Sequence, residues 1–257
     1  KAVKSLGTDH RSIKCFDRDI GAVFPDIIWH AEVPLLRTGP APLFKLSKLV
    51  RENNFKVVLT GEGADEFFAG YNIFKEAKVR RFWASQPESK LRPLLFQRLY
   101  PDIGGLTKSN TAMLAAFFQE NLLAVDAPDY SHAVRWRNGR RNCRFFSEAV
   151  REEAERSRGG NGIESQIPSG FEKWDPLARA QFLEIKIFLS GYLLSSQGDR
   201  MGMAHSIEGR FPFLDCRLVE FCNQLPARLK LRALTEKFLL KQLGRKWLPA
   251  EIWQRPK

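Results

Sequence analysis

The amino-acid sequence predicts an α/β protein with a parallel sheet and a large helical portion. A short apolar run at residues 56–59 contains two adjacent valines and ends at a glycine-rich turn, which is typical of a strand buried on both faces of a parallel sheet. Helical spacing of apolar residues precedes this run and follows it, which is the order of a parallel α/β element. After Tyr71, nearly all of the periodicity is helical.

The segment before the strand supplies the first helices. The first twenty residues predict the end of a helix, a turn at Gly7 and a short strand at residues 13–16. Apolar residues at helical spacing then predict a crossover helix that ends near Asn53, and they are Leu43, Leu46 and Val50.

A tight acidic turn is predicted directly after the strand. Gly61 and Gly63 allow backbone geometries and close approaches that a side chain would forbid. The turn carries three carboxylates within five residues, Glu62, Asp65 and Glu66. Ligands bind at the carboxyl ends of strands in open parallel sheets, so this turn is a candidate site. The alternative is that Asp65 and Glu66 cap the next helix and that the glycines only form a turn.

The later part of the chain is predicted as helices joined by loops. Asp175 is a predicted N-cap with Pro176 in the first turn of its helix. The remaining predictions are helices at 92–100, 111–123 and 145–156, a flexible loop at 157–162, and a buried helical face made of Phe182, Ile185, Leu189 and Leu193.

Residues 199–215 contain a second candidate site. Two acid–base pairs, Asp199 with Arg200 and Glu208 with Arg210, flank a segment of small residues that a ligand could approach. The arginine fork binds carboxylates through two hydrogen bonds, so a ligand with carboxylates would suit this place. The alternative is that the pairs are salt bridges that hold a loop.

A third candidate is Lys237, near the C-terminal end of the sequence. Thr235 is a predicted N-cap, which places Lys237 in the first turn of a helix ending at Gly244. The helix dipole disfavours a cation there by some tenths of a kcal/mol, roughly 0.3–1. Either a bound phosphate or an ion pair with a neighbouring acid would explain the lysine.

Composition narrows the class of protein. Of the 257 residues, 44% are hydrophobic and 27% are charged, which is ordinary for a soluble globular protein. The longest uncharged stretch, residues 187–198, is too short to span a bilayer, and no signal segment is visible, so no membrane association and a cytoplasmic location are expected. Four irregularly spaced cysteines indicate free thiols rather than a zinc site.

The net charge of +12 raises nucleic acid as a partner. Basic residues gather at 75–98, 135–144 and 228–246, and Trp136 stands within the middle group. No recognised nucleic-acid-binding module accompanies this charge, and solvated helix faces explain the same counts. Nucleic-acid binding is therefore not favoured, although a non-catalytic basic RNA-binding module stays as an alternative.

Taken together, the three candidate segments resemble the synthetase domain of glutamine-dependent asparagine synthetase. They are Thr-Gly-Glu-Gly-Ala-Asp-Glu-x-x-x-Gly-Tyr at 60–71, the segment 194–215, and Thr-Glu-Lys-x-x-Leu-Lys at 235–241 with the prolines at 249 and 256. The resemblance extends over essentially the whole chain, so residues 1–257 are expected to form one synthetase domain.

This resemblance implies an ATP pyrophosphatase fold of the adenine nucleotide alpha hydrolase-like type. In the reaction that it implies, ATP activates the β-carboxylate of aspartate as β-aspartyl-AMP, and ammonia delivered from a glutaminase domain displaces AMP. The implied cofactors are ATP and Mg²⁺, and a homodimer is implied as well.

The resemblance also implies roles for individual residues. Thr60, Gly61 and Gly63 would contact the nucleotide, and Asp65 would bind magnesium pyrophosphate. Glu62 would act in adenylate formation and in deprotonating ammonia, and Lys237 would stabilise charge on the transferring phosphoryl group. The residues that would orient aspartate and its intermediate are Asp199, Arg200, Glu208 and Arg210.

The sequence departs from the family pattern in several places. The pyrophosphate-binding loop Ser-Gly-Gly-x-Asp-Ser and the glutaminase domain are not in the sequence, and Val33 stands where the family prefers an acid before the proline. We therefore expect an internal part of a longer enzyme that has little or no activity alone. A related amide-forming ligase, similar to β-lactam synthetase or to an antibiotic-tailoring enzyme, is the main alternative.

Overall fold

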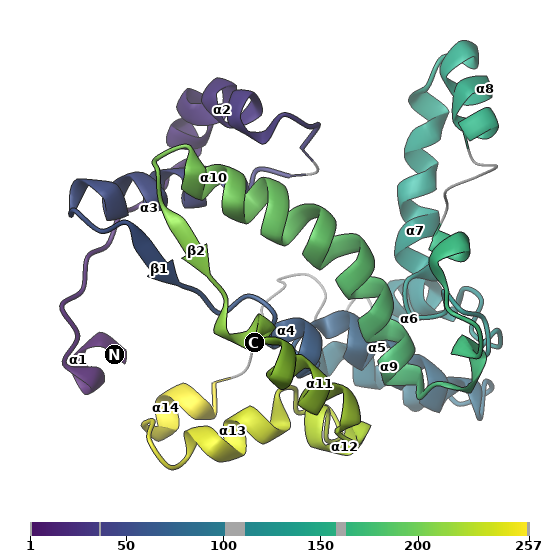
Figure 1. The fold of residues 1–257 in the computed structure, drawn as a ribbon. Helices are drawn as coiled ribbons and strands as arrows, with labels where there is room; N and C mark the ends of the chain where they lie inside the picture. The colour runs from purple at the N-terminus through teal and green to yellow at the C-terminus, as the bar shows by residue number, and fades with distance from the viewer. Residues whose placement is uncertain (1, 36, 101–110, 158–162, 256–257) are drawn as a thin grey trace. The chain divides into compact units, whose positions relative to one another are not determined.

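The computed structural model describes residues 2–35, 37–100, 111–157 and 163–255 (Figure 1). Contacts divide the chain into two compact units, each with its own buried residues. The first unit combines Lys1–Gly70 with Glu184–Lys257, and the second is Tyr71–Leu183. No described helix is long and apolar enough to cross a membrane.

The first unit contains a parallel strand pair and most of the short helices. Its elements are α1 (Ala2–Leu6), α2 (Asp17–Ala31), α3 (Pro40–Glu52), β1 (Val57–Leu59), α4 (Ala64–Phe67), the π-helical η5 (Ile185–Asp199), α10 (Arg200–Met203), β2 (Glu208–Arg210), η6 (Pro212–Leu214), α11 (Cys216–Gln224), α12 (Ala227–Lys230), α13 (Phe238–Gly244) and α14 (Ala250–Trp253).

Strands β1 and β2 pair in parallel, with Val58 opposite Gly209 (Figure 1). This confirms an α/β chain, rich in helix, with a strand after the crossover helix α3. The prediction that the strand is buried on both faces is wrong, because Leu59 is 74% exposed and Val57 is 41% exposed. In the described residues the sheet has only two strands, so β1 has a free edge and its side chains have little cover.

Residues 13–16 form neither a helix nor the expected strand. The turn at Gly7 is confirmed, with φ of +62°. Residues 13–16 form no strand, since no neighbouring strand offers them backbone partners in the described chain. Phe16 instead precedes α2, and its backbone N–H donates to Asp19 Oδ2 at 2.8 Å, which caps the start of the helix.

Helix α3 ends near Asn53 as predicted, but it begins at Pro40 and buries a different face. Asn53 follows its last residue as the C-cap. The buried side chains include Ala41, Phe44 and Ser47, whereas Leu46 is exposed. Phe44 and Ala41 belong to a core cluster completed by residues of α2 and α10, namely Ile27, Ala31 and Met201. The core of this unit therefore packs α3 against α2 and α10, and these helices position the strands.

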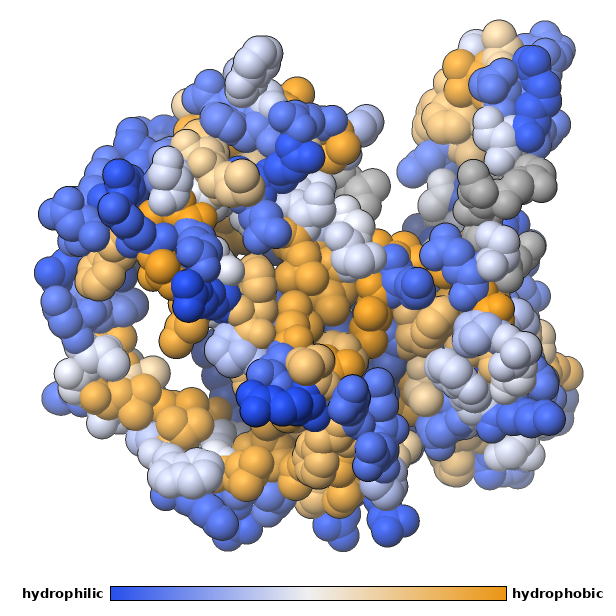
Figure 2. Space-filling model, in the orientation of Figure 1, coloured by the Kyte–Doolittle hydropathy of each residue, from blue (hydrophilic) through white to orange (hydrophobic). Residues whose placement is uncertain are grey.

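Helix η5 is a π-helix, in which each backbone hydrogen bond spans one more residue than in an α-helix. Leu189 and Leu193 are buried, as predicted, and the wider turn also buries Tyr192 and Ser196. Figure 2 shows hydrophobic residues along η5 on this face, while α2 and α3 present mostly hydrophilic ones.

All regular elements described in the second unit are helices, joined by turns and loops. Its elements are α5 (Asn72–Ala84), η1 (Arg92–Arg98), α6 (Thr111–Gln119), α7 (Ala133–Arg140), η2 (Arg141–Phe145), α8 (Glu148–Ser157), η3 (Ile163–Gln166), η4 (Phe171–Lys173) and α9 (Pro176–Glu184), whose last residue belongs to the first unit.

The helical character of this region is as predicted, but the bounds differ. The predicted helix at 92–100 is a 3₁₀ helix at 92–98, the one at 111–123 ends at Gln119, and the one at 145–156 begins at Glu148. Asp175 caps α9 as predicted, because its Oδ1 accepts the backbone N–H of Leu177 at 2.8 Å. Most of the predicted loop at 157–162 lies outside the described residues.

Arg80 is the main polar anchor of this unit. It is 1% exposed, and its guanidinium lies 4.2 Å from the centre of the Tyr130 ring. It donates hydrogen bonds to the carbonyls of Phe118 and Glu120, at 3.1 and 2.7 Å, and to that of Tyr130 at 2.6 Å. The last carbonyls of a helix have no hydrogen-bond partners within that helix. At the end of α6, Arg80 supplies the missing donors.

Arg80→Met keeps a long side chain but removes every donor. Several buried carbonyls would lose their partner, so we expect the free energy of unfolding to fall by about 2–4 kcal/mol. Urea unfolding measures the loss, and faster hydrogen exchange in peptides from residues 72–130 locates it. Arg98→Met, at an exposed position, is the matched control and should change little. An equal effect of both variants would contradict the anchoring role of Arg80.

Candidate active site

The acidic turn follows β1 and is held from two sides. The backbone N–H of Thr60 donates to the carbonyl of Arg210 at 2.9 Å, which extends the strand pairing into the turn. Gly63 begins α4 with φ of +91°, a left-handed conformation that favours glycine. A Cβ on Gly63 would also lie 2.4 Å from Leu214 Cδ2. The turn can therefore pack against the segment after β2 only with glycine at this position.

An ion pair joins Asp65, after the turn, to Lys237, which directly precedes α13. Lys237 Nζ lies 3.0 Å from Asp65 Oδ1, and the two side chains are 27% and 25% exposed. The backbone N–H of Lys237 donates to the carbonyl of Phe68 at 3.1 Å. A Cβ on Gly70 would lie 1.9 Å from Asp65 Oδ1 and 2.4 Å from Lys237 Cε. The fold thus brings together two residues predicted from distant parts of the sequence.

The predicted helix start at Thr235 is wrong. Helix α13 begins at Phe238, and Lys237 is its N-cap in a left-handed conformation with φ of +49°. Thr235 forms an isolated backbone bridge with Arg232 instead. The reason is the tether to Phe68, which fixes the backbone of Lys237 where helical geometry would have to begin.

The charges of Asp65 and Lys237 both affect the pKa of Glu62. Burial raises the pKa of the Glu62 carboxyl above its ordinary value, and the nearby charge of Asp65 raises it further. Lys237 acts in the opposite direction and lowers that pKa. The three charged groups therefore lie close enough to influence one another at the end of β1.

Two further features of the turn suit an incoming ligand. The hydroxyl oxygen of Thr60 is buried and has no hydrogen-bond partner, which is costly unless a ligand supplies one. Space around Gly61 is open, since an added Cβ would meet nothing within 4 Å. A polar ligand with acceptor or donor atoms, such as a nucleotide, fits this pair of observations.

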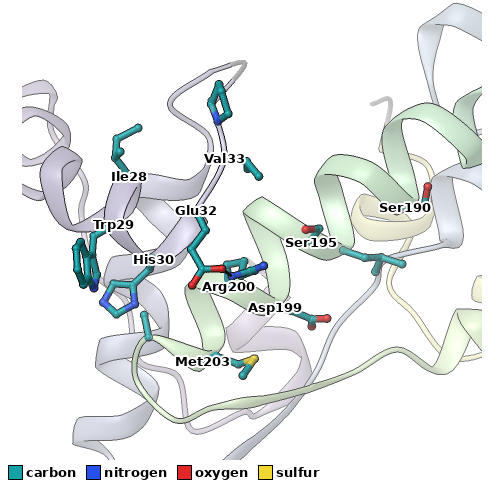
Figure 3. Close-up of a pocket in the computed structure, with 13 residues that line it drawn as sticks. Ile28, Trp29, His30, Glu32, Val33, Ser190, Ser195, Asp199, Arg200 and Met203 are labelled. Carbon is teal, nitrogen blue, oxygen red and sulfur yellow. Dashed lines mark hydrogen bonds and ion pairs between the residues drawn. The ribbon is translucent and has the colours of Figure 1, made fainter. Parts of the chain in front are cut away.

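Asp199 and Arg200 lie in a different place. They line an open pocket of ≈ 1280 Å³ together with the end of α2 (Figure 3). Arg200 Nη1 forms an ion pair with Glu32 Oε2, and Glu32 is the left-handed C-cap of α2. Neither the acidic turn nor Lys237 lines this pocket. The fold therefore divides the predicted site residues into two groups.

Glu208 and Arg210 lie on β2 and pair with each other. Arg210 Nε lies 2.8 Å from Glu208 Oε1, and both side chains are largely exposed. The contact of Arg210 with the turn is made by its backbone carbonyl. The salt-bridge interpretation fits these two side chains, and neither lines the pocket that holds Asp199.

Two contributing residues were not singled out from the sequence. Gly70 leaves the space that the Asp65–Lys237 pair occupies, and Glu32 neutralises Arg200. Gly70 stands in the motif at 60–71, so its position was a usable signal. No local pattern identifies Glu32 as the partner of a residue so far along the chain.

Comparison with known proteins identifies the class to which this arrangement belongs. The family described as asparagine synthase matches residues 1–257, and the chain belongs to that family. The chain is 28% identical over 260 residues to a putative glutamine-hydrolysing asparagine synthetase of Mycobacterium bovis, which covers 100% of this chain and 37% of that protein.

Another relative is Amidase chyE of Penicillium rubens, 28% identical over 267 residues, with 96% of this chain and 38% of that protein covered. Asparagine synthetase 1 of Bacillus subtilis is 25% identical over 237 residues, with 91% and 34% covered. The chain therefore spans less than two fifths of the length of these relatives. No solved structure matches the chain.

Gly70→Ala tests the packing of the ion pair. The new methyl group would overlap Asp65 and Lys237, so the pair must move apart or the backbone must shift. We expect a loss of about 1–3 kcal/mol in the free energy of unfolding. Chemical denaturation measures this loss, with Gly61→Ala as the control because its methyl group would enter open space. Equal stability of Gly70→Ala and the parent chain would refute the packing described above.

The raised pKa of Glu62 predicts how stability changes with pH. Because the folded-state pKa lies above the unfolded value of about 4.3, the folded state binds more protons between these two values. Stability contributed by Glu62 is therefore complete below the unfolded pKa and is lost as pH rises through the folded pKa. Glu62→Gln should thus be less stable relative to the parent at pH 4 than at pH 7. Urea midpoints at both pH values measure this difference, and the opposite order would show that the pKa is not raised.

Proposed function

We propose that this chain is the synthetase part of an ATP-dependent ligase that converts aspartate to asparagine through β-aspartyl-AMP. The observation that carries the proposal is the Asp65–Lys237 pair beside Glu62 at the carboxyl end of β1. Family membership supports the same reaction class. The proposal includes an ATP pyrophosphatase fold of the adenine nucleotide alpha hydrolase-like type, one synthetase domain over residues 1–257, a cytoplasmic location and a homodimer.

Adenylation needs charge neutralisation and in-line positioning rather than a protein nucleophile. Attack by the β-carboxylate oxygen of aspartate on the α-phosphorus forms one P–O bond and breaks the bond to pyrophosphate. Lys237 would stabilise negative charge on the phosphates, while Thr60, Gly61 and Gly63 would contact the nucleotide. Magnesium would be held by Asp65 together with phosphate oxygens and water, and it would supply further positive charge.

The structure contains no preformed metal cage in its described residues, since no group of three or more His, Cys, Asp or Glu side chains is placed to hold an ion. Magnesium usually binds through one or two carboxylates plus substrate phosphates. A single carboxylate at Asp65, already balanced by Lys237, is compatible with an ion that arrives with the nucleotide.

Glu62 would take the proton that ammonia loses when it displaces AMP. Attack of the amine nitrogen on the acyl carbon forms the C–N bond, and AMP leaves with the electron pair of the broken C–O bond. A general base works best when its pKa approaches the operating pH, and burial moves the pKa of Glu62 in that direction. Ammonia would come from a glutaminase domain.

A related amide-forming ligase with another carboxylate or amine is the second candidate. It is favoured by the relative named as an amidase and by the ion pair of Arg200 with Glu32, which uses the arginine expected to orient aspartate. A β-lactam synthetase-like or antibiotic-tailoring activity belongs to this class. Asp199, Glu208 and Arg210 also stay proposals as residues that orient the substrate.

The test measures pyrophosphate release and asparagine formation on the complete gene product with ATP, aspartate and ammonia. Lys237→Met should lower the rate of pyrophosphate release by about 10²–10³, and Glu62→Gln should lower amide formation by at least about 10². Lys246→Met changes an exposed lysine elsewhere and is the control. Release with another carboxylate but not with aspartate would favour the second candidate. No release with any carboxylate would refute the ligase and return attention to RNA binding.

A further inference from the structure

The pocket beside Glu32 is distinct in composition from the acidic turn. Its charged lining residues are two carboxylates and one guanidinium, so it carries one negative charge in excess when His30 is neutral. Most of its other walls are apolar, and they include Trp29, Val33 and Leu194. A pocket of this kind suits a ligand with one positive charge and an apolar body.

The charge of Arg200 is balanced by an ion pair with Glu32, whereas the charge of Asp199 is not balanced in this way. The guanidinium of Arg200 forms its ion pair with Glu32, whereas the Asp199 carboxylate makes no hydrogen bond or ion pair with the described residues. Asp199 is also exposed, at the end of η5. Figure 3 shows the Glu32 and Arg200 side chains meeting, while Asp199 projects from the end of η5 and Met203 from α10, which follows it directly. The charge available to a ligand is therefore negative.

The apolar walls are unusually accessible. Trp29 is 79% exposed and Met203 is 71% exposed, although both are large and hydrophobic. Burying such side chains against a ligand is favourable by roughly 25 cal/mol for each Å² of apolar surface removed from water. A tryptophan face and a methionine sulfur also suit cations and aromatic rings. Ammonia alone would leave nearly all of the ≈ 1280 Å³ unused.

We propose that this pocket binds an organic amine in its protonated form, with the ammonium group at Asp199 and the apolar body along Met203 and the other apolar walls. The geometry assigns Glu32 a second role, because it neutralises Arg200 and so keeps the pocket from attracting carboxylates. This inference rests on the charges and the apolar walls of the pocket and does not require the adenylation chemistry. Failure of amine binding would leave the proposed reaction standing, because that reaction is argued from the acidic turn and Lys237, and it would leave Asp199 to the substrate.

The experiment compares three probes that share a phenyl ring and a short linker. They are 2-phenylethylamine, 2-phenylethanol and 3-phenylpropionate, tested by calorimetry and by ligand-observed NMR on the chain. We expect the amine to bind about tenfold more tightly than the alcohol, and the carboxylate to bind most weakly. Asp199→Asn should weaken amine binding about tenfold, while the circular dichroism spectrum stays unchanged.

A double variant tests whether the charge preference of the pocket can be inverted. Asp199→Asn combined with Glu32→Gln leaves Arg200 as the charged group of the pocket, so the preference should invert and 3-phenylpropionate should bind better than the amine. Glu220→Gln, an exposed acid outside the pocket, is the control and should bind as the parent does. Equal binding of all three probes, or no effect of Asp199→Asn, would overturn the proposal and indicate nonspecific apolar binding. A preference of the parent chain for the carboxylate would overturn it as well.

Discussion

The ion pair between Asp65 and Lys237 is the constraint on which the candidate active site depends. It joins the turn after β1 to the segment before α13, so the chain must close over a long loop to form it. Two local costs accompany it. Lys237 adopts a left-handed backbone conformation, which costs on the order of 1–3 kcal/mol in a residue other than glycine. Position 70 must also be glycine, because a side chain there would collide with the pair. Such costs persist only where the surrounding contacts fix the geometry, here the bond from Lys237 to the Phe68 carbonyl.

The strand pairing gives this ion pair its surroundings. Because β1 and β2 run in parallel and stay paired through Thr60, the turn leaves the sheet beside the segment that contains Leu214. That segment packs against Gly63 and closes one side of the turn. Glu62 and the Thr60 hydroxyl are consequently drawn out of water before any ligand is present. Both features reduce the stability of the free protein, and both become favourable when a ligand supplies a proton donor or a positive charge. These two features favour the interpretation of the turn as a binding site over that of a helix cap.

Structural features that depend on residues close in the sequence are predicted correctly. Features that depend on contacts between distant residues are not. The strand, the crossover helix, the turn at residues 60–66 and the cap at Asp175 follow from local patterns, and all are present. The burial of Leu59 was mispredicted because it depends on additional layers of structure, and β1 has one paired neighbour in the described sheet. The start of α13 was mispredicted because the tether of Lys237 to Phe68 overrides the capping preference of Thr235. Arg200 was placed with the substrate because its partner Glu32 lies far away in the sequence.

The Asp65–Lys237 and Glu32–Arg200 ion pairs differ in their exposure to solvent, and this difference separates their roles. About a quarter of each side chain is exposed in the Asp65–Lys237 pair, so salt screens it weakly and it holds its geometry. In the Glu32–Arg200 pair the two side chains are 65% and 38% exposed, and an exposed pair contributes little stability, about 0–1 kcal/mol. Its main effect is on the charge of the pocket that it lines. A pair that holds its geometry suits the proposed reaction centre, whereas the exposed pair acts mainly by balancing the charge of Arg200. The charge of the pocket and the geometry of the acidic turn therefore depend on different ion pairs.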